Sequence, residues 1–219
     1  MNRPAPHGPV SINAVSINPV STDPVSTDPA STNPVLHLYL STTARPPRDA
    51  FGRAASPSGL ALLRDASRRA AGPDTRPARD GGGRWHWPGS VWRGSVSHAG
   101  PRGLAAVAEG AWIGVDLQDE RPRPAALGWL AGVLGQPPER VTLRHWAETE
   151  ALLKATGVAG VRPRRMDLPA WREGWRETPC GWWLWSGPAG ADHVAVAAEH
   201  PLPMQWSETQ RTEGEESHP

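Results

Sequence analysis

Cysteine and long apolar runs are nearly absent from this chain. Its one cysteine, Cys180, excludes a disulfide framework and a metal site built from several thiolates. No apolar run approaches the roughly eighteen residues that a membrane-spanning helix needs, and the first residues lack the apolar core of a signal peptide. We therefore expect a soluble, cytoplasmic protein that has no membrane partner.

Lysine is as scarce as cysteine. Of the 23 basic residues, 22 are arginine and one is lysine, Lys154. In a chain that uses arginine almost everywhere, a lone lysine reflects either chance or a position that needs a compact ammonium on a flexible stem. The residues around Lys154 have to decide between these two explanations.

Excess charge is also absent, because the formal net charge of the 219 residues is +1. This balance gives no indication of a nucleic-acid partner. The arginines gather in the first half, where residues 41–84 hold nine arginines and four aspartates, and the residues after Trp206 are acidic. A basic half suits an anionic ligand or partner, although a solvated basic surface has the same composition.

The N-terminal part is a five-residue repeat. Residues 10–34 read VSINAVSINPVSTDPVSTDPASTNP, with a proline in most repeats and few bulky apolar residues. This composition excludes a continuous strand ladder and an amphipathic helix. We expect residues 1–34 to be a disordered low-complexity extension and residues 206–219 to be an acidic tail.

Short strands and helices alternate between these ends. Strands are expected at 35–40, at 104–117 in two pieces around a turn at 109–110, at 167–175, at 181–187 and at 191–200, with short extended pieces at 84–100. Helices are expected at 59–71, 125–135 and 139–157. This mixture predicts an α+β protein with an N-terminal lobe at 35–112 and a C-terminal lobe at 113–205.

Two segments carry residues suited to phosphate and metal chemistry. SVSHAG (95–100) reads as a glycine-flanked turn, which either presents backbone N–H groups and His98 to an anion or is an ordinary turn. WIGVDLQDE (112–120) is an apolar strand that ends in Asp116. It is either a strand running out into a polar turn or half of a metal site.

The helix at 139–157 supplies a third candidate segment. Trp146, Glu150 and Lys154 are spaced at i, i+4 and i+8, so they share one face of the helix. Alone, this spacing fits an exposed Glu–Lys pair beside a tryptophan at the edge of the core. Mg²⁺ needs only one or two carboxylates where substrate phosphates complete its coordination sphere, so Asp116 with Glu150 would suffice.

The order and spacing of these three segments resemble the Sfp-type 4′-phosphopantetheinyl transferase superfamily. SVSHAG, GVDLQ and W-x-x-x-E-A-x-x-K occur in the order of that family's SHS(G), GIDIE-like and W-x-x-KEA-x-x-K motifs, and HWPGSV (86–91) resembles a segment of the enterobactin-synthetase type. The resemblance covers residues 35–203. It implies two pseudo-symmetric lobes, each a small antiparallel sheet with a long helix, and an active site in the cleft between them.

The resemblance also implies an enzyme, a holo-[acyl-carrier-protein] synthase type phosphopantetheinyl transferase. Such an enzyme transfers the 4′-phosphopantetheine arm of coenzyme A to a serine of an acyl or peptidyl carrier protein, depends on Mg²⁺, and releases adenosine 3′,5′-bisphosphate. The implied co-substrate is coenzyme A, the implied partner is a carrier protein, and we expect a monomer that does not bind nucleic acid.

Matched residue by residue, the resemblance assigns roles at the site. Asp116 and Glu150 match the metal carboxylates, and Gln118 stands where many members carry a second acid. Glu150, directly or through a metal-bound water, would take the proton of the carrier serine, and Lys154 would stabilise the leaving group. His98 is assigned with these two to the catalytic residues. Contacts to coenzyme A would come from Arg84, Ser97, His98 and Lys154; because Leu60 stands where an arginine is common, Arg53, Arg64 and Arg68 are alternatives there.

Three residues depart from the motifs. Besides Gln118, Thr149 replaces the lysine before the glutamate, and Ala99 replaces the second serine of SHS. An amide oxygen can bind Mg²⁺ weakly or accept from a metal-bound water, whereas a one-residue shift along a strand would turn Asp119 to the opposite face. These departures keep open a degenerate family member that binds coenzyme A or a carrier protein without transfer, and a Trp-rich binding domain with no coenzyme A site.

Overall fold

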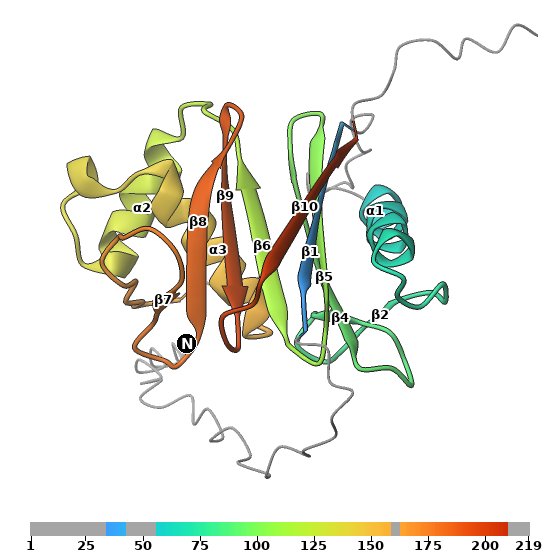
Figure 1. The fold of residues 1–219 in the computed structure, drawn as a ribbon. Coiled ribbons are helices and arrows are strands. Elements are labelled where there is room, and N and C mark those ends of the chain that lie inside the picture. Colours follow the sequence, from blue (N-terminus) through green and yellow to red (C-terminus); the bar gives the residue numbers. More distant parts are fainter. Residues whose placement is uncertain (1–33, 43–55, 159–162, 210–219) are drawn as a thin grey trace, which may run out of the picture. The chain divides into compact units, whose positions relative to one another are not determined.

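The computed structural model of the chain describes residues 34–42, 56–158 and 163–209. The low-complexity extension predicted at 1–34 lies outside the described residues, except for residue 34. The described part is mixed α+β, with a six-stranded sheet, a four-stranded sheet and three α-helices (Figure 1). Among these residues, no helix combines the length and the apolar character needed to cross a membrane.

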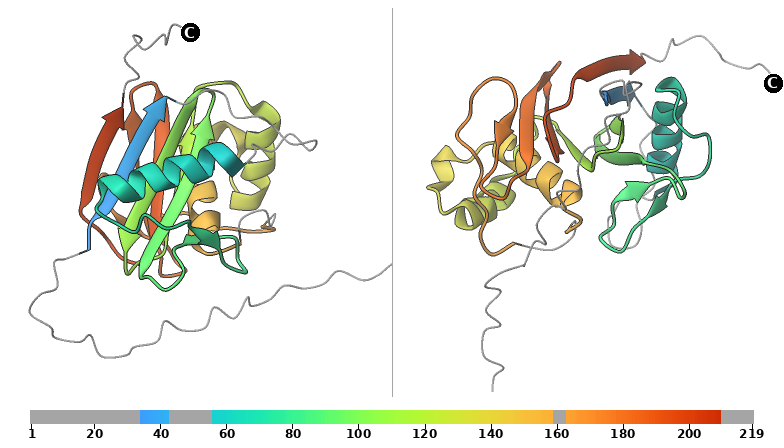
Figure 2. Two further views of the ribbon diagram at one scale, coloured as in Figure 1. Left: turned by 90° about the vertical axis from the view of Figure 1, so that its right-hand side faces the viewer. Right: turned by 60° about the horizontal axis from the view of Figure 1, so that its bottom comes forward.

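The six-stranded sheet has the strand order β10-β1-β5-β4-β3-β2. Its strands are β1 (Leu36–Thr42), β2 (Ala78–Arg79), β3 (Trp85–His86), β4 (Trp92–Ala99), β5 (Arg102–Glu109) and β10 (Met204–Thr209). Neighbouring strands are antiparallel except β1 and β10, which are parallel. Helix α1 (Ser56–Arg69) lies across one face of this sheet (Figure 2).

The four-stranded sheet has the order β6-β9-β8-β7 and is antiparallel throughout. Its strands are β6 (Ile113–Gln118), β7 (Arg176–Glu177), β8 (Trp183–Ala189) and β9 (Asp192–Ala198). After β6 come helix α2 (Pro124–Leu134), a short 3₁₀ helix η1 (Pro138–Arg140) and helix α3 (Leu143–Ala155). Helix α3 packs on β6 and β9.

The main core lies between the two sheets. Strands β1, β5, β6 and β9 give alternate side chains to it, and fully burying a valine, leucine or isoleucine contributes about 1.5–3 kcal/mol. The residues are buried leucines of β1, Leu104, Ala106 and Ala108 of β5, Ile113, Val115 and Leu117 of β6, and Val194, Val196 and Ala198 of β9. Because Asp116 alternates with Val115 and Leu117, it points away from this core and toward α3.

Several predicted boundaries are wrong. The helix predicted at 139–157 is interrupted: residues 138–140 form η1, and α3 begins at Leu143. Residues 206–209, predicted as the start of the tail, belong to β10 and pair with β1. Residues 167–175, predicted as a strand, are irregular, and the two-residue strand β7 begins directly after them. Pro169 offers no N–H for a strand ladder, and Gly174 has a positive φ of 80°, which ends extended structure.

Candidate functional site

The site is built around Asp116, which lies in β6 on the face toward α3. The same face carries Gly114, where an added Cβ would lie 2.0 Å from the carbonyl oxygen of Ala151. Only glycine allows α3 to approach β6 this closely. The close approach brings the α3 stripe that holds Lys154 directly over Asp116, whose exposed fraction is 3 %.

Three side chains donate hydrogen bonds to the Asp116 carboxylate. Ser97 Oγ lies 2.7 Å from Oδ1, and Lys154 Nζ lies 2.7 Å from the same oxygen. Gln118 Nε2 lies 2.5 Å from Oδ2. The structure therefore brings one residue from each of the three predicted segments into direct contact at a buried carboxylate.

The lone lysine has a specific role in these contacts. Besides its ion pair with Asp116, Lys154 Nζ donates to the backbone oxygen of Val115 at 2.9 Å. A compact ammonium with three donors can reach both acceptors from one helix turn, whereas a planar guanidinium has a fixed fork geometry. This arrangement favours the second of the two explanations for the lone lysine, a position that requires an ammonium.

Ser95 joins the same region, and the sequence prediction missed it. Its Oγ accepts from the backbone N–H of Val115 at 2.9 Å, so two serines of β4 reach across to the edge strand β6 of the other sheet. Residues 95–99 lie in β4 rather than in the predicted turn, which begins at Gly100. The alternation of Ser95 and Ser97 in a strand would have indicated a shared face.

Glu150 lies one helical turn before Lys154 on α3. Burial, and then the negative charge of Asp116, raise the pKa of Glu150, while Lys154 partly opposes this shift. Two carboxylates thus influence each other across a partly buried site that holds one lysine. Such a site gains from additional positive charge.

The site contains oxygen donors of the kind that Mg²⁺ prefers, although hydrogen-bond donors contact both oxygens of Asp116. Oε1 of Gln118 is buried and has no hydrogen-bond partner within the described residues, although its amide nitrogen bonds Asp116. Asp116, Glu150 and this amide oxygen are the hard oxygen donors that Mg²⁺ prefers. Within the described ranges no three His, Cys, Asp or Glu side chains gather to hold a metal, so a third protein oxygen would come from another residue type, and the unpartnered Gln118 Oε1 is the candidate.

His98 occupies the opposite face of β4 from Ser97. It lies beside Gly59 of α1 and Gly103 of β5, and its Nε2 is buried without a partner in the described part of the chain. Burial and, more weakly, the charge of Lys154 lower the pKa of His98. The structure therefore does not bring His98 into contact with Asp116, although it lies within the electrostatic range of Lys154.

Among the described residues, none of the predicted arginines forms an ion pair with Asp116. Arg84 forms an ion pair with Asp80 at 2.8 Å, and its guanidinium lies 3.7 Å from the centre of the Trp112 ring. It lies next to Gly157, just after the C-terminal end of α3. Arg64 is exposed on α1, and Arg53 lies outside the described residues.

The departures at Ala99 and Thr149 are buried positions here. Ala99 packs in the core between the sheets, with an exposed fraction of 4 %, where a serine hydroxyl would require a partner. Thr149 has an exposed fraction of 1 % on α3. Asp119, just after β6, accepts hydrogen bonds from Arg121 and Arg123, which lie outside the site.

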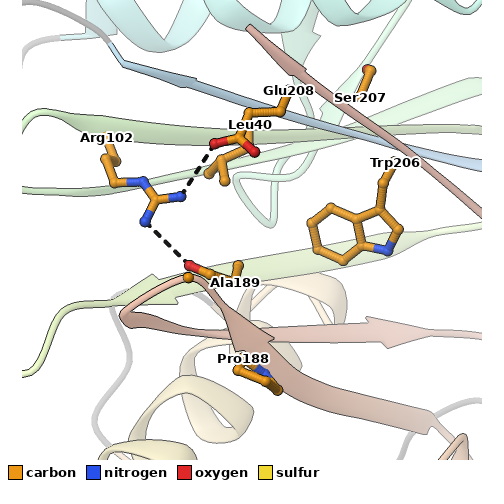
Figure 3. A pocket seen from close by; sticks show the side chains of 8 residues that line it. Leu40, Arg102, Pro188, Ala189, Trp206, Ser207 and Glu208 are labelled. Atoms are coloured by element: carbon orange, nitrogen blue, oxygen red, sulfur yellow. Dashed lines mark hydrogen bonds and ion pairs between the residues drawn. The ribbon is translucent and has the colours of Figure 1, made fainter. Parts of the chain in front are cut away.

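A pocket of about 390 Å³ lies elsewhere, between the β8–β9 turn and the ends of β1 and β10 (Figure 3). Its lining residues are Leu40, Arg102, Pro188, Ala189, Gly190, Trp206, Ser207 and Glu208. None of the predicted site residues lines it. The residues suited to chemistry therefore lie around Asp116 and not in this pocket.

The chain was also compared with known proteins. No family model matches it, and no curated protein matches it at a significant level.

Proposed function

We propose that the protein is a Mg²⁺-dependent 4′-phosphopantetheinyl transferase of the Sfp type. One observation carries the proposal: Ser97, Gln118 and Lys154, one from each motif, all contact the buried carboxylate of Asp116. The motif order alone did not require these contacts. The two sheets with α1 and α3 on their outer faces are compatible with two pseudo-symmetric lobes around a cleft, which is part of this proposal.

The chemistry follows from the positions of the polar groups. The hydroxyl oxygen of a carrier serine forms a new bond to the β-phosphorus of coenzyme A, and the pyrophosphate P–O bond breaks, so adenosine 3′,5′-bisphosphate leaves. Glu150, whose pKa is raised by burial and by Asp116, accepts the serine proton. The Lys154 ammonium stabilises negative charge on the departing phosphate. Bound to Asp116, Glu150 and Gln118, Mg²⁺ would neutralise pyrophosphate charge.

The proposed protein substrate is an acyl or peptidyl carrier protein, which is typically acidic around its modified serine. Exposed arginines of the first half offer a complementary surface; in the described part they are Arg64, Arg68, Arg69, Arg76 and Arg79. Complementary charge speeds association and weakens with salt. The initial transfer rate should therefore fall as the ionic strength rises.

A transfer assay tests the proposal. The full-length protein is incubated with coenzyme A, Mg²⁺ and a panel of apo acyl and peptidyl carrier proteins, and each carrier is weighed by mass spectrometry. The expected result is a gain of one phosphopantetheine arm on the carrier serine. A folded protein that modifies none of the panel would contradict the proposal.

A second candidate is a protein that binds coenzyme A or a carrier without transfer. The observation that favours it is the Lys154–Asp116 ion pair, because the ammonium occupies the carboxylate oxygen that a metal would use. Calorimetry distinguishes the two candidates. Coenzyme A binding that is independent of Mg²⁺, with no mass gain on any carrier, selects this second candidate.

A further inference from the structure

The contact between α3 and the four-stranded sheet is made largely of small residues. Ala147, Ala151 and Ala155 repeat at i, i+4 and i+8 along α3, and they meet Gly114 of β6 and two alanines of β9. The large buried side chains of this cluster are Leu152 and Leu184, and Met166, Leu168 and Trp182, which lie outside α3 and the strands, pack against it. Small residues allow close approach, but they do little to fix the rotation of a helix about its own axis.

One flank of the alanine stripe carries a fully buried charge network. Glu148 has an exposed fraction of 0 %, and its Oε1 lies 2.7 Å from Arg176 Nη2 and 2.6 Å from Ser186 Oγ. Arg176, in β7, has an exposed fraction of 1 %, and Ser186 lies in β8. Arg144 also bonds Glu148: its Nη1 lies 3.0 and 3.2 Å from the two oxygens of the Glu148 carboxylate.

The other flank carries the proposed chemistry. Glu148 and Lys154 are three residues before and three residues after Ala151, so they lie about 60° to either side of it around the helix. Lys154 bonds Asp116 on β6, and Glu148 bonds Arg176 and Ser186 on β7 and β8. Hydrogen bonds and ion pairs therefore hold α3 on both sides of a contact that is made mostly of alanines.

We infer that Glu148, Arg176 and Ser186 are positioning residues that fix the rotation of α3, so that Glu150 and Lys154 face Asp116. The catalytic part of this inference rests on the proposed function, whereas the positional part does not. A rotation of about 10° moves an atom near the helix surface by roughly 1 Å. A misplacement of that size can reduce a reaction rate about 100-fold.

The lone lysine makes the position of α3 measurable without any transfer activity. Lys154 is the only lysine of the chain, so a small amine-reactive reagent has one side-chain target, which peptide mass mapping separates from the N-terminal amine. In the native protein its ammonium is held by Asp116 and the Val115 oxygen, which slows modification. The modification rate therefore reports directly on whether α3 keeps this contact.

The test compares two variants with the wild type. Glu148→Met combined with Arg176→Met removes both charges and keeps the volume, and Glu148→Gln removes only the charge of the glutamate. We expect the double variant to raise the Lys154 modification rate about tenfold and to lower the kcat of transfer about 100-fold, with little change in the KM for coenzyme A. Glu148→Gln should give smaller changes in the same direction.

Leu63→Ala is the matched control for lost stability. Leu63 is a fully buried residue of α1, in a core cluster that contains no residue of α3, so this change lowers the melting temperature without altering the Lys154 rate. If Glu148→Gln and any folded double variant keep the wild-type Lys154 rate, the inference is overturned. If the wild type shows no transfer but the variants still release Lys154, the positional inference stands and the proposed function fails.

Discussion

Asp116 accepts hydrogen bonds from Ser97, Gln118 and Lys154, which come from β4, β6 and α3. A carboxylate with an exposed fraction of 3 % requires such partners, because burying an unpaired charge is costly. A second carboxylate, that of Glu150 on the same helix as Lys154, lies within electrostatic range of Asp116. Residue-level predictions therefore concern the charge balance of these five side chains.

Replacing Glu150 by glutamine should stabilise the metal-free protein at neutral pH. Because burial and Asp116 raise the pKa of Glu150, the folded state binds this proton more tightly than the unfolded chain. The free energy of unfolding therefore falls as pH rises from the ordinary glutamate range through the raised pKa of Glu150. With a chelator present, we expect Glu150→Gln to be more stable by about 1 kcal/mol at neutral pH and equal to wild type in acid.

Denaturant unfolding across pH checks this prediction. Glu139→Gln, which makes the same charge change on the exposed helix η1, serves as the control and should change stability little. A Glu150→Gln protein that is less stable than wild type at neutral pH would show that Glu150 makes a stabilising ion pair instead.

Replacing Gln118 by glutamate should make stability depend more strongly on Mg²⁺. The change removes the Nε2 donor to Asp116 and adds a third negative charge at a residue whose exposed fraction is 6 %. Without metal we expect a loss of about 1–3 kcal/mol, because a buried hydrogen bond is lost and like charges meet. Mg²⁺ should restore the melting temperature to a greater extent than in wild type.

Gln205→Glu is the matched control, because Gln205 is exposed on β10. An equal response of the wild type and Gln118→Glu to Mg²⁺ would argue against a metal at this position.

At the level of elements, the close approach of α3 to β6 decides whether the site exists. Gly114 lets the backbones of Ala151 and Ala155 lie where a Cβ would otherwise be. Moving α3 outward would break the contact of Lys154 with Asp116. Gly114 was part of the GVDLQ motif in the sequence, but its packing role became apparent only from the structure.

Gly114→Ala should destabilise the protein and loosen this contact. The new Cβ would lie 2.0 Å from the Ala151 oxygen and 2.5 Å from the Ala155 nitrogen, and backbone atoms cannot move aside as flexible side chains do. We expect a loss of about 1–3 kcal/mol in denaturant unfolding, as for other overpacked cores. Gly128→Ala in α2 meets no atom within 4 Å and should be neutral or stabilising. A neutral Gly114→Ala would contradict the packing of α3.

Most elements were predictable because their local patterns are strong. The alternation of Val194, Val196 and Ala198 predicted β9, and the helical spacing before Gly157 predicted α3. The strand β10 was not predicted, because its pairing with β1 joins residues far apart in the sequence. The face on which His98 lies was not predicted either, because SVSHAG was read as a turn and not as a strand with alternating faces.

At the scale of the whole molecule, polar contacts join the two sheets in addition to their shared apolar core. Arg102 of β5 forms an ion contact of 2.8 Å with Asp192 of β9. Arg102 also donates to the Ala189 oxygen at 3.1 Å and lies 3.7 Å from Glu208 of β10 (Figure 3). The serines of β4 join the same two sheets through β6. Polar contacts therefore join the two sheets in two places, at Arg102 and at the serines beside Asp116.

Arg102→Met should weaken the junction of the two sheets. The Asp192 side chain has an exposed fraction of 8 %, and burial and Asp119 already raise its pKa while Arg102 opposes the shift. Removing the arginine leaves a nearly buried carboxylate without this partner, and we expect a loss of about 1–3 kcal/mol. Adding Asp192→Asn should restore part of the loss in a double-mutant cycle. Fully additive losses would show that the two residues are not coupled.

The central claim is that the residues gathered around Asp116 transfer phosphopantetheine, and the most direct measurement is the mass of an apo carrier protein after incubation with coenzyme A. With Mg²⁺, the wild type should add one phosphopantetheine arm, and a chelator should stop the reaction. Glu150→Gln, although folded, should be slower by about 10²–10⁴-fold, the usual contribution of a general base. Transfer by Glu150→Gln at the wild-type rate, or no transfer by the folded wild type to any acyl or peptidyl carrier, would contradict the account.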